Sequence, residues 1–146
     1  MNRYLPDTPC LIALLCDWHE HHQPTLRDME RRRTAGDRLV LAAPALVEAY
    51  SVLTRLPAPF RLTEQDAMNL LEANWRKAET VSLGPQEYWK TLQAAAVQGI
   101  GGGQIYDAVI AACARKARAK AILTWNAVHF LPFQSRDLAV LTPAMR

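Results

Sequence analysis

Cysteine is scarce in this sequence, and the few cysteines present do not form a motif. Only three occur, at positions 10, 16 and 113, and none belongs to a Cys-x-x-Cys pair. This pattern excludes a disulfide framework and a cysteine-based zinc site, because both need regularly spaced thiols. We therefore expect buried or free thiols in a reducing compartment.

The sequence also lacks an apolar run long enough to cross a membrane, which takes about 18 residues. Residues 10–16 form a short run, and the longer stretch 39–53 is interrupted by Pro44 and Glu48. An export signal is not expected, because the polar sequence 17–20 follows the first run where a small-residue cleavage site belongs. We predict a soluble, cytoplasmic protein with no membrane partner.

Charge of one sign is only mildly in excess. The 17 basic and 14 acidic residues leave a formal charge of +3, which is compatible with a polyanionic partner without demanding one. Half of the 146 residues are hydrophobic and 21% are charged, a balance that excludes a disordered tail. The length suits one compact domain over residues 1–146, and no repeat or linker divides it.

Short apolar runs alternate with longer stretches of helical period. Strands separated by helices indicate a parallel sheet covered on both faces. We predict an α/β fold, a three-layer α/β/α domain with a mainly parallel four- to five-stranded sheet. The expected strands are 4–5, 38–41, 79–83 and 121–124, with 138–141 as the candidate fifth, and the expected helices are 8–16, 21–34, 44–56, 63–75, 86–98 and 104–117.

Several polar residues fall where ligands bind in such a sheet, beyond the carboxyl ends of the strands. Asp7 follows the first strand, and Thr124 and Asn126 stand at the end of the fourth. Glu48 lies one turn into the helix after the second strand, and Asp107 lies in the first turn after a glycine loop. These side chains are expected to converge on one cleft.

Each acid also has a purely structural interpretation. Asp7 precedes Thr8-Pro9 and is suited to cap a helix, and Asp107 is placed to complement a helix dipole. Glu48 is harder to explain in this way, because its apolar neighbours in the sequence indicate a helix buried on most sides. A buried carboxylate costs several kcal/mol unless a cation or a hydrogen-bond network meets it. A metal ion or a partner elsewhere in the fold would meet that cost.

The ligand types point to a particular metal. Two or three carboxylates without a cysteine or histidine cluster favour a hard cation such as Mg²⁺ or Mn²⁺. Such an ion suits phosphate ester hydrolysis, because it lowers the pKa of a bound water and neutralises charge in the transition state. We therefore predict metal binding by Asp7, Glu48 and Asp107.

Other motifs carry less chemistry. The glycine loop 99–103 follows a helical pattern and lacks the Lys-Ser/Thr pair of a P-loop, which favours a flexible turn. The histidines within 19–22 and the arginines 31–33 are typical of solvated helix surfaces, although the arginines suit an RNA-binding rim as well. Trp125 is the one tryptophan adjacent to the expected cleft, and it is a candidate for base stacking.

Four pieces of the sequence resemble the PIN-domain ribonucleases, and within them the VapC-type toxins of bacterial toxin–antitoxin pairs. They are Asp7-Thr8, the stretch 46–55 (LVEAYSVLTR), the stretch 105–112 (IYDAVIAA) and the stretch 122–130 (ILTWNAVHF). They occur in the family's order and span essentially the whole chain. The resemblance implies a metal-dependent endoribonuclease that hydrolyses RNA phosphodiester bonds, is inhibited by a small cognate antitoxin and forms a homodimer.

The resemblance also implies residue roles. By position, Asp7, Glu48 and Asp107 match the family's three core acids and Thr124 matches a hydroxyl residue lining the site. Asn126 falls where many members carry a fourth acid, and Pro9 stands where Asn or Ser is common. These departures leave open the alternative of a weak or inactive PIN-like domain that binds RNA or a protein. A phosphoacceptor domain is disfavoured because Asp7 lacks an adjacent acid, and a Rossmann dehydrogenase because no glycine motif follows the first strand.

Overall fold

A parallel sheet with the order β3-β2-β1-β4-β5 forms the centre of the molecule. The structure is a computed structural model that describes residues 1–143. The strands are β1 (Arg3–Pro6), β2 (Arg38–Ala42), β3 (Glu79–Val81), β4 (Ala121–Leu123) and β5 (Ala139–Leu141). Every strand pair is parallel, and β1 lies between β2 and β4, with Tyr4 opposite Leu39 on one side and Ala121 on the other. All carboxyl ends therefore meet at one edge.

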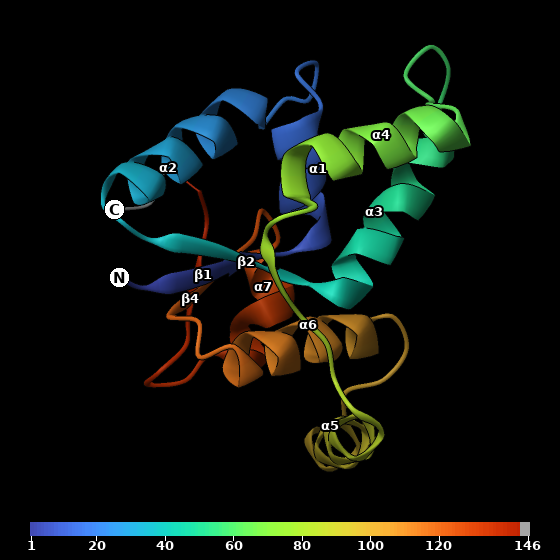
Figure 1. Ribbon diagram of the computed structural model, residues 1–146. Helices are drawn as coiled ribbons and strands as arrows, with labels where there is room; N and C mark the ends of the chain where they lie inside the picture. The colour runs from blue at the N-terminus through green and yellow to red at the C-terminus, as the bar shows by residue number, and fades with distance from the viewer. Residues whose placement is uncertain (144–146) are drawn as a thin grey trace.

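Helices cover both faces of this sheet (Figure 1). The first group lies to one side of the sheet and consists of α1 (Thr8–Leu15), α2 (His22–Thr34), α3 (Ala43–Thr54) and α4 (Glu64–Trp75). The second group lies to the other side and consists of α5 (Pro85–Gln98), α6 (Gln104–Lys116), α7 (Ala127–Phe130) and a 3₁₀ turn (Leu131–Phe133). The predicted three-layer α/β/α architecture is confirmed.

The core follows from the apolar runs of the sequence. Leu5, Val40 and Ile122 are fully buried on the three central strands, as expected for strands covered on both faces. Helix α3 buries Ala45 and Ala49 one turn apart, and these small side chains allow α1 to pack closely against it. The acid-bearing starts of α1 and α3 are thereby held beside each other.

The local signals in the sequence act as predicted at several helix ends. The side chain of Thr63 accepts a hydrogen bond from the Asp66 backbone N–H, and α4 begins there. Gly99 ends α5 in the left-handed conformation, with φ of 72°, which glycine adopts without steric cost. The short helix α7 and the 3₁₀ turn were not predicted, because a four-residue segment carries no measurable helical period.

The three cysteines are free and buried, in agreement with the prediction from their spacing. Within residues 1–143, no helix combines the length and the apolar character that a membrane span requires.

Candidate functional site

Asp7 is the buried centre of the site. It directly follows β1, and only 2% of its surface is exposed. Its Oδ1 accepts a hydrogen bond from the Cys10 backbone N–H at 2.9 Å and so caps α1. Its Oδ2 accepts a bond of 2.6 Å from the hydroxyl of Thr124, which follows the neighbouring strand β4. Oδ1 of Asp7 therefore caps a helix, and Oδ2 links the ends of the strands β1 and β4.

The environment of Asp7 opposes its ionisation. The pKa of Asp7 is raised to about 7, chiefly by burial; the hydrogen bonds from Thr124 and Cys10 lower it, and the negative charges of Asp107 and Glu48 raise it. The three predicted acids therefore act on one another, although they come from three different elements. A proton or a cation would relieve this repulsion.

Glu48 corrects one step of the sequence interpretation. Its side chain is exposed and not buried, because the inward stripe of α3 consists of Ala45, Ala49 and Leu53. The cost of burying Glu48 is therefore no argument for a metal ion. Its position is still informative, since its Oε2 accepts a 3.0 Å hydrogen bond from the hydroxyl of Thr8, the residue next to Asp7.

Asp107 lies in the first turn of α6 with 26% of its side chain exposed. Burial raises the pKa of Asp107; the nearby His129 lowers it, and the charge of Glu48 raises it. His129 Nδ1 lies 3.9 Å from Asp107 Oδ2. Helix dipole complementation is thus not the only role of this acid, because it also shares the electrostatic field of the other two.

Thr124 and Asn126 connect these groups. The Thr124 hydroxyl is fully buried and accepts a 2.8 Å hydrogen bond from the Asn126 backbone N–H. The Asn126 side-chain amide is exposed, and its Nδ2 lies 2.9 Å from His129 Nδ1. A chain of contacts therefore runs from Asp7 through Thr124 and Asn126 to His129, beside Asp107.

Two polar residues of this region were not assigned a role from the sequence. Thr8 holds Glu48, and His129 lies between Asn126 and Asp107. The adjacency of Thr8 to Asp7 was a usable signal for the first. No comparable signal existed for His129, because the contact depends on how α7 packs against α6.

The donor atoms fit a hard cation only as a partial ligand set. Within residues 1–143, no three histidine, cysteine or carboxylate side chains are grouped so that they hold a metal ion directly. Mg²⁺ usually keeps several waters and binds through one or two carboxylates. The oxygen ligands and the mutual repulsion of Asp7, Glu48 and Asp107 are compatible with that mode of binding.

An open groove extends from this site. It has a volume of about 730 Å³ and is lined by Glu48, together with residues of α3, α5 and α6. Tyr106 and Tyr88 line it with 68% and 40% of their surface exposed, and Arg55 adds a cation. Exposed aromatic rings and a cation beside Glu48 are features that suit single-stranded nucleic acid.

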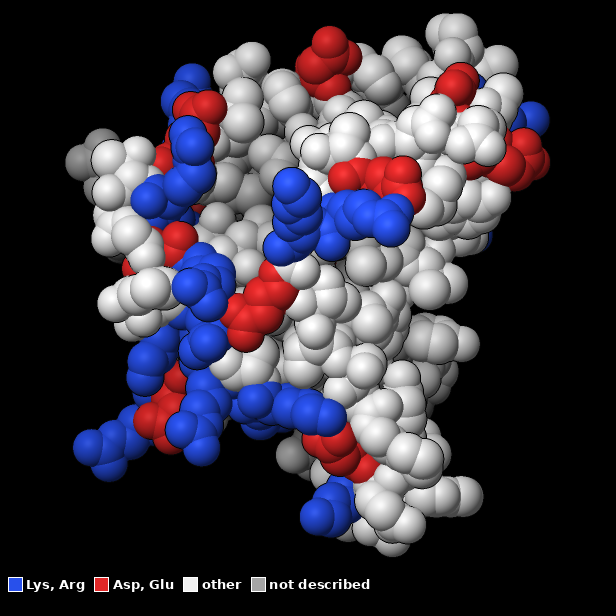
Figure 2. Space-filling model, viewed as in Figure 1, with Lys and Arg blue, Asp and Glu red and all other residues white. Residues whose placement is uncertain are grey.

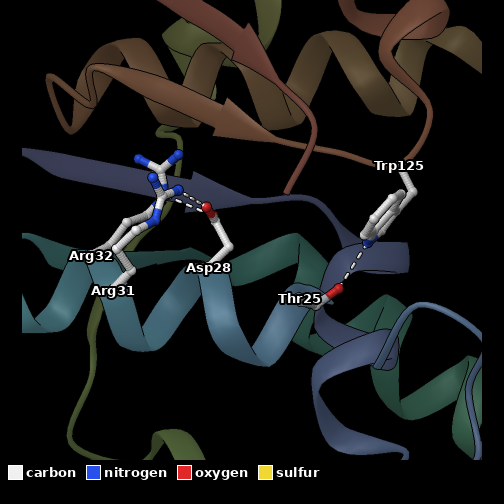
Figure 3. A network of polar contacts seen from close by, with 5 residues as sticks. All are labelled: Thr25, Asp28, Arg31, Arg32 and Trp125. Carbon is white, nitrogen blue, oxygen red and sulfur yellow. Dashed lines mark hydrogen bonds and ion pairs between the residues drawn. The ribbon is translucent and has the colours of Figure 1, made fainter. Parts of the chain in front are cut away.

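Trp125 is held in place by contacts with the segment 21–25. Its Nε1–H donates a 2.9 Å hydrogen bond to the Thr25 hydroxyl on α2 (Figure 3). Its ring stacks on His21, with 3.9 Å between the ring centroids. Trp125 therefore joins the segment after β4 to α2. The prediction of a base-stacking role for this residue has no support in these contacts.

The other polar motifs are mostly structural. Arg31 and Arg32 both pair with Asp28, whose side chain is fully buried (Figure 3). Only 15% of the Arg32 side chain is exposed, so the prediction of a solvated helix surface is wrong for Arg32. In the segment 19–22, His22 contacts the Ala13 carbonyl oxygen and His19 accepts from the His21 backbone N–H, which leaves these histidines in local roles.

Comparisons with known proteins agree with this geometry. A family model described as PIN domain matches residues 4–129. The chain is 36% identical to Ribonuclease VapC40 of Mycobacterium tuberculosis over 115 residues, which are 79% of this chain and 81% of the relative.

Solved structures show the same fold. VapBC-1 from nontypeable Haemophilus influenzae superposes with a TM-score of 0.69 at 19% identity, covering 98% of this chain and 99% of that one. Mycobacterium tuberculosis VapC20, described as a sarcin-ricin loop cleaving toxin, gives a TM-score of 0.63 at 14% identity and covers 82% of this chain and 86% of that one.

Proposed function

This chain belongs to the PIN-domain family, and on that basis we propose that it is an endoribonuclease, the toxin of a VapBC-type pair, that depends on Mg²⁺ or Mn²⁺. One observation carries the site assignment. Asp7 is a buried carboxylate whose pKa is raised to about 7 by burial and by two further carboxylates from separate elements. Carboxylates whose negative charges repel one another in a buried site are suited to bind a cation, because the cation offsets that repulsion.

Asp7, Glu48 and Asp107 would hold the ion together with several of its waters, since the three side chains are not grouped closely enough to ligate it directly. When bound, a divalent cation supplies a water of lowered pKa and neutralises charge on the phosphate. The chain's own residues position the ligands for this task. Thr124 fixes the Oδ2 atom of Asp7, and Thr8 fixes the Oε2 atom of Glu48. Asn126 contributes its amide at the rim of the site, where it orients His129 toward Asp107.

The substrate is RNA in this proposal. The named relative VapC40 is a ribonuclease, and the groove beside Glu48 offers aromatic rings to unstacked bases. Non-cleaving RNA binding is not favoured, because all three acids are present and act on one another.

A cleavage assay on a mixed RNA pool tests this function. Wild type is expected to generate new RNA ends with Mn²⁺ and none with EDTA. Asp107→Asn is expected to lose at least about 100-fold in rate, because it removes one ligand charge. Asp66→Asn is the matched control, since Asp66 also lies in the first turn of a helix and is exposed. Equal cleavage by wild type and Asp107→Asn would contradict the proposal.

The proposed partners are a small antitoxin and a second copy of the chain. Solved structures with this fold carry the names VapBC-1 and VapBC2, which join a VapC protein with a second component, and this supports the first. Helix α5 supports contact with a second copy of the chain, because its apolar side chains are largely uncovered. Trp89 and Val97 have 63% and 88% of their surface exposed, and Ala95 is the one residue of this helix that is buried. The buried free thiols fit a cytoplasmic location. Light scattering of the purified chain, with and without the product of the adjacent gene, tests both partners.

A further inference from the structure

Basic side chains collect at the edge of the sheet opposite the acids. This strand-start edge lies where the parallel strands begin, whereas Asp7 and Thr124 follow their ends. In Figure 2, Lys and Arg gather along the side on which the N-terminus and the start of β1 lie in Figure 1. Its cations are Arg3, Arg38, Arg115, Arg118, Lys120 and Arg136.

The sheet register makes the edge continuous. In the backbone register, Arg3 on β1 lies opposite Arg38 on β2. On the other side of β1, the Lys120 backbone N–H donates a 2.7 Å hydrogen bond to the Arg3 carbonyl oxygen. Adjacent strands lie about 4.8 Å apart, so cations of three neighbouring segments stand in a row. Beyond Lys120, the row continues into a pocket of about 410 Å³ lined by Arg115 and Arg118.

The charges of this edge are only partly compensated. Glu79 is shared by Arg3 at 3.1 Å and Arg38 at 3.6 Å, and Asp137 lines the pocket. With Asp37, which accepts a hydrogen bond from the Asn2 backbone N–H, three carboxylates stand against the six cations named above. Among residues 1–143, no ion pair involves Arg115, Arg118, Lys120 or Arg136.

Helix dipoles do not account for these cations. Arg115 lies in the last turn of α6, where a cation complements the dipole. Arg118 and Lys120 lie beyond the helix, and Arg118 is exposed in the left-handed conformation with φ of 56°. The exposed aromatic side chains Trp18, Phe60, Tyr88, Trp89 and Tyr106 all belong to other segments. The edge thus offers charge without stacking surfaces, which suits a phosphate backbone and not unstacked bases.

We infer that the strand-start edge is a second RNA-binding surface, which contacts the phosphate backbone of the substrate away from the cleavage site. This inference rests on the proposed function, because it takes RNA as the polyanion. Arg3 and Asp7 stand at opposite ends of β1, about 13 Å apart along the strand, so one phosphate cannot contact both. Long or folded RNA reaches both surfaces, and a short oligonucleotide reaches the acids alone.

The test compares two RNAs and three variants. The double variant R118E/K120E is expected to bind a long folded RNA on the order of tenfold more weakly. The slope of its salt dependence should fall by about one unit for each phosphate that the edge no longer binds. Cleavage of a short single-stranded oligonucleotide should be unchanged. The control R27E/R61E reverses the charge at two exposed positions outside the edge, and it should bind the folded RNA as tightly as wild type does.

A second variant separates binding from folding. R118G/K120Q removes both charges, and glycine is favoured at the left-handed position 118, so the fold is not weakened there. This variant should also bind the folded RNA more weakly. Folded RNA bound equally well by wild type and both edge variants would overturn the inference, and so would an equal weakening in R27E/R61E. Absence of oligonucleotide cleavage by wild type would instead overturn the proposed function, while the binding comparison would still decide the role of the edge.

Discussion

The Thr124 hydroxyl donates a 2.6 Å hydrogen bond to Asp7, across 117 positions of sequence. Both residues follow the ends of neighbouring parallel strands, β4 and β1, so the sheet itself brings them together. The bond fixes one carboxylate oxygen and favours the ionised form of an acid that burial would otherwise keep protonated. Thr124 is therefore a positioning residue for Asp7, and its removal has measurable consequences.

Thr124→Val is expected to raise the pKa of Asp7 further and to leave the Asn126 backbone N–H without its acceptor. Removing a buried hydrogen-bond partner costs about 1–3 kcal/mol. The pH profile of RNA cleavage should shift to higher pH in this variant, whereas a purely structural role would lower stability and leave the profile in place. Thr124→Ser keeps the hydroxyl and should restore the wild-type profile. Identical profiles for Thr124→Val and wild type would contradict the positioning role.

Asp7 should make stability depend on pH when no metal is present. Its folded pKa is about 7, above the unfolded value near 3.9, so the folded state retains its proton longer. In EDTA, the contribution of Asp7 to the free energy of unfolding is therefore largest below pH 4. It falls by roughly 1.4 kcal/mol per pH unit up to about pH 7.

Asp7→Asn removes this titration while retaining an oxygen that accepts from the Cys10 backbone N–H. In urea unfolding with EDTA, the variant should be more stable than wild type at pH 8 and should lack the decline between pH 4 and 7. Asp66→Asn, at an exposed position, should keep the wild-type pH dependence. Parallel stability curves for wild type and Asp7→Asn would show that Asp7 is not the group responsible.

Divalent cations should reverse the cost of ionising Asp7. Mg²⁺ or Mn²⁺ at about 100 times its dissociation constant is expected to stabilise the folded chain by about 2.7 kcal/mol at neutral pH. Differential scanning calorimetry should show a higher Tm with either ion, and Asp7→Asn should reduce the increase. An increase of equal size in Asp7→Asn would place the bound ion elsewhere.

Tyr106 should affect substrate binding more than chemistry, because its ring lines the groove beside Glu48 with 68% of its surface exposed. Base stacking on an aromatic ring contributes about 1–3 kcal/mol, so Tyr106→Ala should raise KM for RNA about tenfold or more with a smaller change in kcat. Tyr106→Phe should behave like wild type. The exposed Phe60 is outside the groove, and Phe60→Ala serves as the control. A fall in kcat alone would contradict stacking.

The sequence predicts the framework of this site better than its contacts. Asp7 before Thr8-Pro9 marks the start of a helix directly after a strand. Both features depend on neighbouring residues in the sequence, so they were predictable. The exposure of Glu48 was not predictable in the same way, because apolar neighbours do not reveal which face of a helix packs inward. The contacts of Glu48 with Thr8 and of His129 with Asp107 depend on how separate helices meet. The contact of Trp125 with Thr25 was not predictable for the same reason, since the two residues lie 100 positions apart in the sequence.

The central claim is that Asp7, Glu48 and Asp107 share one divalent ion that RNA cleavage requires, and Mn²⁺ titration followed by electron paramagnetic resonance tests it most directly. Glu48→Gln is the most informative variant, because Glu48 is exposed and its substitution does not disturb the core. We predict that Glu48→Gln weakens Mn²⁺ binding and RNA cleavage together, by about tenfold or more. The exposed-acid control Glu64→Gln should change neither. Wild-type Mn²⁺ affinity in Glu48→Gln, or RNA cleavage that persists in EDTA, would contradict the account.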